Sequence, residues 1–164
     1  MPDIKLGSLF DGIGVFPLAA SRCGIRPVWA SEIEKAPISI TKRHFPEMEH
    51  LGDITKVDGG KIEPVHVLTF GSPCQNLSLI GNRSGLAGAK SSLFYQAFRI
   101  VHEMRDATDN LYPVILVWEN VMGAFSTNDR MDFRAVLSAF ADTEVPMPPS
   151  GRWGNAGMVR GGTP

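Results

Sequence analysis

The sequence predicts an α/β domain built on a mostly parallel sheet of about five strands. Short apolar runs alternate along the chain with segments that carry apolar residues at helical spacing, a pattern typical of strands joined by crossover helices. Glycines or acidic residues follow each apolar run, and open parallel sheets bind their ligands at these carboxyl ends of strands. The chain has 164 residues, 43% of them hydrophobic and 20% charged, which is enough to bury the core of one such domain.

The first predicted elements are a strand, a tight turn, a helix and a second strand. Residues 4–10 form a short apolar run that ends in the turn-forming residues 11–14. A helix is expected next, because Pro17 suits a first helical turn and Gly24 suits the position just past a helix end. The second strand is predicted at residues 27–30, before an acidic stretch.

The middle of the chain adds a helix and two strands. A helix is predicted over residues 37–44, again with a proline at its start, and a brief strand is predicted around Leu51. Residues 65–70 form a nearly continuous apolar strand, as expected where helices cover both faces of a sheet. The glycine- and serine-rich residues 71–90 are expected to form a long loop, and loops of that length are usually functional or disordered.

The last predicted elements are a helix, a strand and a helix. A serine at position 91 or 92 caps the first of these, whose apolar residues keep helical spacing as far as Met104. We expect a strand over residues 114–118 and a helix over 132–141. The folded domain is therefore expected to cover residues 1–143.

Residues 144–164 differ in composition from the rest of the chain. Prolines and then glycines are frequent there, with little apolar material between them. We expect an irregular or disordered tail, with a composition that resembles the start of a linker.

Charge and cysteine content narrow the class of protein. The formal net charge is −1, without the basic footprint typical of duplex DNA binding. No apolar run is long enough to span a membrane, and residues 1–10 lack the features of a signal peptide. Cys23, at a helix end, is interpreted as a small packed residue, and neither it nor Cys74 belongs to a metal-ligand pattern. These features favour a metal-free protein in a reducing, cytoplasmic setting.

The ends of the first three strands carry residues that suit an adenosine ligand. Gly12 and Gly14 allow close approach of the backbone, although Pro17 stands where the dinucleotide fingerprint has its third glycine. Glu32 lies about 20 residues after the turn, where an acid accepts hydrogen bonds from ribose; a solvated acid at a helix start is the alternative. Asp53 suits either an adenine amino group or a simple turn.

The ends of the next two strands carry a thiol and a carboxyl group. Cys74 follows Pro73 in a polar loop and is expected to be reachable by solvent, as a thiolate nucleophile must be; an inert thiol is the alternative. None of the four histidines lies at a strand end, which argues against a Cys-His hydrolase. Glu119, directly after the fifth strand, suits a general acid or simply caps the next turn.

These segments, in this order, resemble the cytosine-5 DNA methyltransferase family. The pair Pro-Cys-Gln and Glu-Asn-Val, each after an apolar strand, is highly specific, and the likeness reaches from the start of the chain to about Ala141. The resemblance implies a Rossmann-like methyltransferase fold that depends on S-adenosylmethionine. The matching segments are SLFDGIG (8–14), SEIE (31–34), GDIT (52–55), GSPCQNLS (71–78), SLFYQAFRIV (92–101) and WENV (118–121).

The resemblance also implies roles for individual residues. It makes Cys74 the nucleophile that attacks C6 of a cytosine flipped out of duplex DNA, with Glu119 acting at N3 and the exocyclic amine. Contacts to DNA are weaker candidates, equally compatible with a solvated loop: Gln75, Ser78, Arg83 and Lys90, with Asn120 orienting the loop around Glu119. The residues implied to hold S-adenosylmethionine are Phe10, Gly12, Ile13, Gly14, Glu32, Ile33, Asp53 and Ile54, with Pro73 and Leu93 nearby.

The family's later segments are not found in this sequence. These are an arginine-bearing Gln-x-Arg-x-Arg strand, a variable target-recognition domain and a C-terminal segment that completes the cofactor pocket. The sheet is therefore expected to lack its last strands, and a complementary C-terminal half is an expected partner. Two alternatives remain open: a remnant that binds cofactor without catalysis, and a nicotinamide-dependent oxidoreductase, which Pro17 disfavours.

Overall fold

The computed structural model describes residues 3–71, 93–120, 130–151 and 153. The chain divides into two compact units. The first unit contains residues 1–72 and 96–119, and the second contains residues 73–95 and 120–164. The candidate site is built on the first unit.

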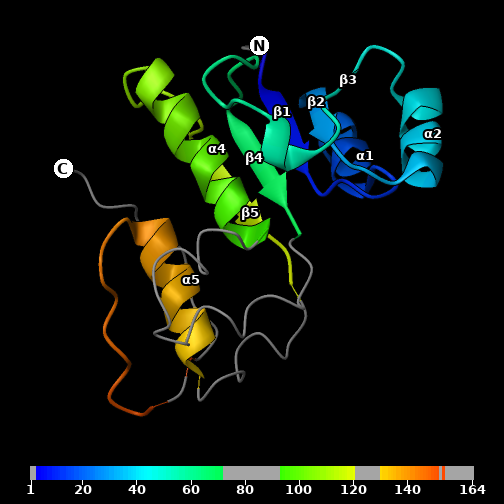
Figure 1. The fold of residues 1–164 in the computed structure, drawn as a ribbon. Coiled ribbons are helices and arrows are strands. Elements are labelled where there is room, and N and C mark those ends of the chain that lie inside the picture. Colours follow the sequence, from blue (N-terminus) through cyan, green and yellow to red (C-terminus); the bar gives the residue numbers. More distant parts are fainter. Residues whose placement is uncertain (1–2, 72–92, 121–129, 152, 154–164) are drawn as a thin grey trace. The chain divides into compact units, whose positions relative to one another are not determined.

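A five-stranded parallel sheet forms the centre of the first unit (Figure 1). Its strand order is β3-β2-β1-β4-β5, so the chain winds outward from β1 through β2 to β3 and then crosses back to β4. This crossing places a topological switch point between β1 and β4, where open α/β sheets bind ligands. The predicted fold class is confirmed. The strands are β1 (Lys5–Leu9), β2 (Arg26–Ser31), β3 (Glu49–His50), β4 (Val67–Phe70) and β5 (Ile115–Trp118).

Helices cover both faces of this sheet. The helices that contribute to the first unit are α1 (Val15–Arg22), α2 (Lys35–His44) and α4 (Leu93–Ala107). Ala20 of α1 packs with Leu6 and Val67, whereas Phe98 of α4 meets Phe70 edge-on with ring centroids 5.9 Å apart. Val67 and Phe70 are three residues apart on one strand, so their side chains point to opposite faces. It follows that α1 and α4 lie on opposite faces.

The interior of the sheet is mostly apolar, with Ser8, Ser31 and Thr69 as buried polar residues of the strands. All of β4 is buried, as are Leu9 and Trp29 on the neighbouring strands. The indole Nε1–H of Trp29 donates to the carbonyl of Glu63 at 2.8 Å, which satisfies the polar atom of this buried ring. The apolar run seen in the sequence thus becomes the centre of the core, as predicted for a strand covered on both faces.

The strand β5 forms one edge of the sheet. Ile115 is 53% exposed and Val117 is 39% exposed, and these alternate residues point to the same face. Apolar side chains of this size are uncommon on an exposed edge strand.

Element bounds differ from the predicted ones by small shifts. The brief strand predicted around Leu51 occupies Glu49–His50, because Gly52 already turns the chain with a φ of 71°. The interpretation of Cys23 as a packed residue is wrong: its thiol is free and exposed at the C-cap of α1. In the described parts of the chain, no helix is long and apolar enough to cross a membrane.

The second unit contains the first residues of α4 and the helix α5 (Met131–Ala141). Phe133 of α5 meets Trp153 edge-on at 5.5 Å, and the Arg134 Nε donates to the carbonyl of Val145 at 2.7 Å. Residues 144–151 form no helix or strand but lie against α5 through such contacts. The boundary between domain and tail at residue 143 stays a prediction.

Candidate functional site at the carboxyl edge of the sheet

The turn after β1 has the backbone shape of a ligand-binding loop. Phe10, Gly12 and Gly14 all have positive φ, at 55°, 57° and 84°. At Gly14 a Cβ would lie 2.7 Å from the Thr41 side chain of α2, so both the backbone angle and the packing require glycine. At Gly12, in contrast, a Cβ would meet no atom within 4 Å. The turn therefore leaves open space beside Gly12, where another molecule can approach the backbone.

Glu32 connects this turn to the end of β2. Its Oε2 accepts a hydrogen bond from the backbone N–H of Gly12 at 2.8 Å, and its Oε1 accepts from Ile33 at 2.7 Å and Glu34 at 3.0 Å. A carboxylate offers about four acceptor positions, so these bonds occupy most of them. Glu32 therefore fixes the loop geometry, besides offering negative charge at the edge. The side chains of Ile13 and Ile33 beside it are 56% and 66% exposed.

Asp11 has the opposite environment. Its carboxyl group is buried, and neither oxygen has a hydrogen-bond partner of good geometry among the described residues. Burial raises the pKa of Asp11 to about 6; the nearby Ser8 hydroxyl lowers it in part, and the negative charge of Glu32 adds to the rise. Sequence reasoning treated Asp11 only as a turn residue. The sequence does show an acid between an apolar strand and two glycines. It does not show that the side chain of this acid is buried.

Asp53 lies beyond the end of β3, at the start of the short 3₁₀ helix η1 (Ile54–Lys56). Its Oδ1 accepts from the backbone N–H of Thr55 at 3.0 Å and from the Thr55 hydroxyl at 2.8 Å. These bonds hold the pKa of Asp53 below its usual value, and the bond from the Thr55 hydroxyl has the largest effect. The side chain is 39% exposed. Asp53 is thus an oriented, ionised carboxylate with access to solvent.

Neighbouring contacts fix the backbone just before Asp53. The Ser31 hydroxyl donates to the carbonyl of Gly52 at 2.7 Å, and the Leu51 N–H donates to the carbonyl of Ala30 at 2.8 Å. The side chain of Ile54 is buried in the core, at 3% exposure, so only its backbone lies at the edge.

Glu119 lies at the carboxyl end of β5, on the other side of the switch point from the glycine turn. Its N–H donates to the carbonyl of Phe70 at 3.0 Å, which continues the pairing of β4 with β5 by one residue. A Cβ on Gly71 would lie 3.2 Å from the Glu119 Oε2, so the carboxylate lies over the Gly71 backbone. The exposed Glu119 side chain therefore stands at the start of the segment that carries the Pro-Cys-Gln sequence.

Of the remaining predicted site residues, the structure describes only Leu93 and Asn120. Leu93 begins α4, and the half-buried Asn120 directly follows Glu119. A group of three or more metal-ligating side chains does not occur among the described residues. Outside the described residues lie Pro73, Cys74, Gln75, Ser78, Arg83 and Lys90.

Comparison with known proteins identifies the family. Residues 4–144 match the model of the C-5 cytosine-specific DNA methylase family. The chain belongs to this family. The resemblance inferred from the sequence motifs is therefore confirmed.

Individual methylases of known sequence are similar to this chain over most of its length. It is 34% identical to a DNA N-6-adenine-methyltransferase of Escherichia phage P1, over 93% of this chain and 21% of the relative. It is 33% identical to the type II methyltransferase M.HhaI of Haemophilus parahaemolyticus, over 77% of this chain and 36% of that protein. The chain thus spans about a fifth to a third of the length of such relatives.

A solved structure supports the methylase fold. An Escherichia coli prophage protein described as a DNA modification methyltransferase superposes with a TM-score of 0.56 at 22% identity. The match covers 83% of this chain and 38% of that protein.

Proposed function

We propose that this chain is the cofactor-binding and catalytic part of a DNA cytosine-5 methyltransferase. Membership of the methylase family supports the reaction class. The observation that carries the proposal is the alignment of candidate groups along one sheet edge: the open glycine turn with Glu32, then Asp53, and on the other side of the switch point Glu119 over Gly71. Cys74 follows Gly71 by three residues in the sequence.

The described residues suit the adenosine part of S-adenosylmethionine. The space beside Gly12 admits a ligand against the backbone, and Glu32 and Asp53 supply acceptors for ribose hydroxyls and the adenine amino group. The exposed side chains of Ile13 and Ile33 offer apolar surface for a base. When bound there, S-adenosylmethionine supplies an electrophilic methyl group.

The chain's own residues would overcome the low reactivity of cytosine C5. The Cys74 thiolate adds to C6 of a flipped cytosine, and the pyrimidine then carries an electron-rich C5–C4 enamine. Glu119 supplies a proton or hydrogen bond to N3 and accepts from the exocyclic amine, which stabilises this adduct. After C5 is methylated, loss of the C5 proton returns electrons to the ring and expels the thiolate.

Trapping with duplex DNA that contains 5-fluorocytosine, in the presence of S-adenosylmethionine, tests this chemistry. The fluorine blocks the final elimination, so Cys74 stays bonded to C6. We expect a weak adduct or none from the chain alone and a clear adduct after a methylase C-terminal half is added. The adduct should vanish in Cys74→Ser and persist in Cys23→Ser, the matched control at an exposed free cysteine. Equal yields from both variants, or no adduct under any condition, would reject the proposal and favour a cofactor-binding remnant.

The same cysteine variant also tests which base is methylated. The phage P1 relative is named for methylation of the exocyclic amine of adenine. That reaction requires no thiolate adduct, because the amine itself attacks the methyl group. Methylation of adenine that survives Cys74→Ser would therefore assign that specificity instead.

We further propose that the exposed edge of β5 receives additional strands from a complementary C-terminal part. The matched relatives are about three to five times longer than the matched region, and Ile115 and Val117 present apolar surface along this edge. Pairing there would satisfy the edge backbone, and elements of the same C-terminal part packed on that face would cover both side chains.

A further inference from the structure

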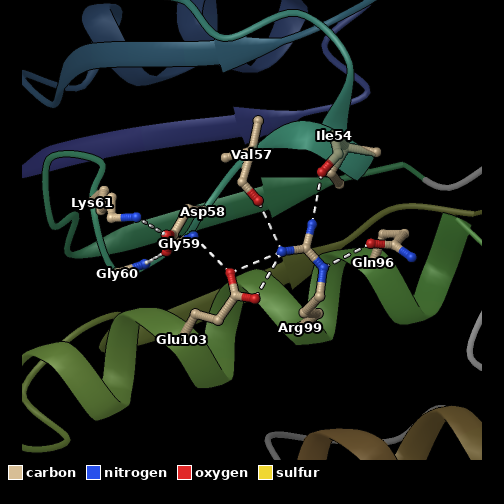
Figure 2. Close-up of polar contacts among 9 residues, drawn as sticks. All are labelled: Ile54, Val57, Asp58, Gly59, Gly60, Lys61, Gln96, Arg99 and Glu103. Carbon is tan, nitrogen blue, oxygen red and sulfur yellow. Dashed lines mark hydrogen bonds and ion pairs between the residues drawn. The ribbon is translucent and has the colours of Figure 1, made fainter.

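Two side chains of α4 hold the segment that follows Asp53 (Figure 2). The Arg99 Nη2 donates to the carbonyl of Ile54 at 2.7 Å, and its Nη1 donates to the carbonyl of Val57 at 2.8 Å. The Arg99 Nε donates to the Gln96 Oε1 at 2.7 Å, which fixes the plane of the guanidinium from within the same helix. Arg99 therefore connects α4 to both ends of η1.

Glu103, one turn further along α4, completes this contact. Its carboxylate accepts from the Arg99 Nη1 at 2.8 and 2.9 Å and from the backbone N–H of Gly59 at 2.7 Å. Gly59 lies so close to the helix that a Cβ on it would be 2.5 Å from the carbonyl oxygen of Ile100. The loop after η1 is thus in direct contact with the helix backbone, and its position depends on that of α4.

The chemistry of arginine suits this geometry. The Ile54 carbonyl also accepts the Val57 N–H at 3.2 Å. The planar guanidinium reaches the carbonyls of Ile54 and Val57 at once, which a lysine ammonium cannot do in the same arrangement. The side chain of Arg99 is 32% exposed, so its bonds are only partly screened. Asp53 caps the N-terminal end of the same short helix through Thr55, directly before Ile54. A change in the position of η1 must therefore move the Asp53 carboxylate.

We infer that Arg99 is a positioning residue for the cofactor site, which with Glu103 sets η1 so that the Asp53 carboxylate faces the adenine amino group. The ligand named here rests on the proposed function. The geometric part, that Arg99 sets the position of the Asp53 carboxylate, does not rest on the proposed function. The two parts are tested separately.

The first test uses the protein without ligand. NMR titration of Asp53 is compared in the wild type, Arg99→Met and Arg105→Met, the last a matched arginine on α4 outside this network. Because the Thr55 bonds hold the pKa of Asp53 low, we expect it to rise in Arg99→Met and stay unchanged in Arg105→Met. An unchanged Asp53 titration in folded Arg99→Met overturns the inference. If that variant does not fold, Arg99→Lys serves, since it keeps the ion pair with Glu103 but not both carbonyl bonds.

The second test uses ligand affinity. Calorimetry compares S-adenosylhomocysteine with its analogue that lacks the 6-amino group. In Arg99→Met the preference for the amino-bearing ligand should fall by about tenfold, the size of one lost hydrogen bond. Equal losses for both ligands indicate general loosening and overturn the inference. Failure of the wild type to bind either ligand, both alone and after a methylase C-terminal half is added, rejects the proposed function, and the Asp53 titration then still decides the role of Arg99.

Discussion

At the scale of single residues, the turn after β1 places two carboxylates in opposite environments. Glu32 accepts backbone N–H groups with both oxygens, whereas Asp11 is buried without a partner of good geometry among the described residues. The first arrangement stabilises a charge and the second disfavours it. Their consequences for stability and binding are therefore of opposite sign.

Asp11→Asn is expected to stabilise the protein at neutral pH. Because the folded-state pKa is raised, to about 6 from 3.8, stability is lost as pH rises through this interval and stays low above it. Removing the charge should raise the free energy of unfolding by up to about 3 kcal/mol at pH 8 and little at pH 4. Urea unfolding at both pH values measures this, with the exposed Asp106→Asn as control. Equal destabilisation at both pH values would contradict the prediction.

Glu32→Gln is expected to weaken the loop and the affinity for S-adenosylhomocysteine. The amide NH₂ must face at least one of the backbone N–H donors, so at least one hydrogen bond is lost at a cost of about 1 kcal/mol. Calorimetric titration and thermal unfolding measure the two effects. The matched control is Glu34→Gln, two residues away and exposed. A similar loss of affinity in both variants would show that overall charge, not the bonds of Glu32, matters.

At the scale of elements, close packing fixes how strands and helices fit together. Gly7 of β1 faces the ring of Trp29 on β2, and a Cβ there would lie 2.3 Å from two ring atoms. The pairing of β1 with β2 changes register between Leu6 and Gly7, directly beside this contact. Sequence patterns predicted both strands, but not that a small residue in one accommodates the indole of the other.

Gly7→Ala should therefore destabilise the sheet. We expect a loss of about 1–3 kcal/mol, since the buried ring has little room to move. Chemical denaturation measures it in Gly7→Ala, in Trp29→Phe and in the double variant. Because the smaller ring relieves the overlap, the double variant should lose less than the sum of the two single losses. Strict additivity would mean that Gly7 and Trp29 do not interact as described.

At the scale of the whole molecule, the strand order decides where the candidate groups meet. The switch between β1 and β4 brings Glu119 and Gly71 to the same sheet edge as the glycine turn. The same topology leaves β5 as an edge strand with two exposed apolar side chains. One arrangement thus accounts for both the proposed site and the proposed need for further strands.

Substitutions on β5 test the proposed assembly. The variant Ile115→Thr with Val117→Thr should retain the fold of the chain, because both side chains are already exposed. It should reduce association with an added methylase C-terminal half, measured by size-exclusion chromatography and by adduct yield. Leu111→Thr, exposed but outside the strand, should leave association unchanged. Association that is insensitive to the β5 variant would place the contact elsewhere.

The sequence by itself determined the order and type of elements and the family. Apolar periodicity and turn residues are local properties, so the strands, the helices and the glycine turn were predicted with only small shifts in their bounds. Glu32 and Asp53 were identified because they follow predicted strands, which needs no knowledge of which strands are neighbours.

Only the tertiary structure decided which groups are buried, paired or brought together from distant segments. The burial of Asp11 and the contact of Arg99 and Glu103 with the loop after η1 depend on how elements pack, which local periodicity does not encode. The physical reason is that burial and hydrogen bonding are properties of neighbours in space, and the parallel sheet makes neighbours of residues far apart in the chain.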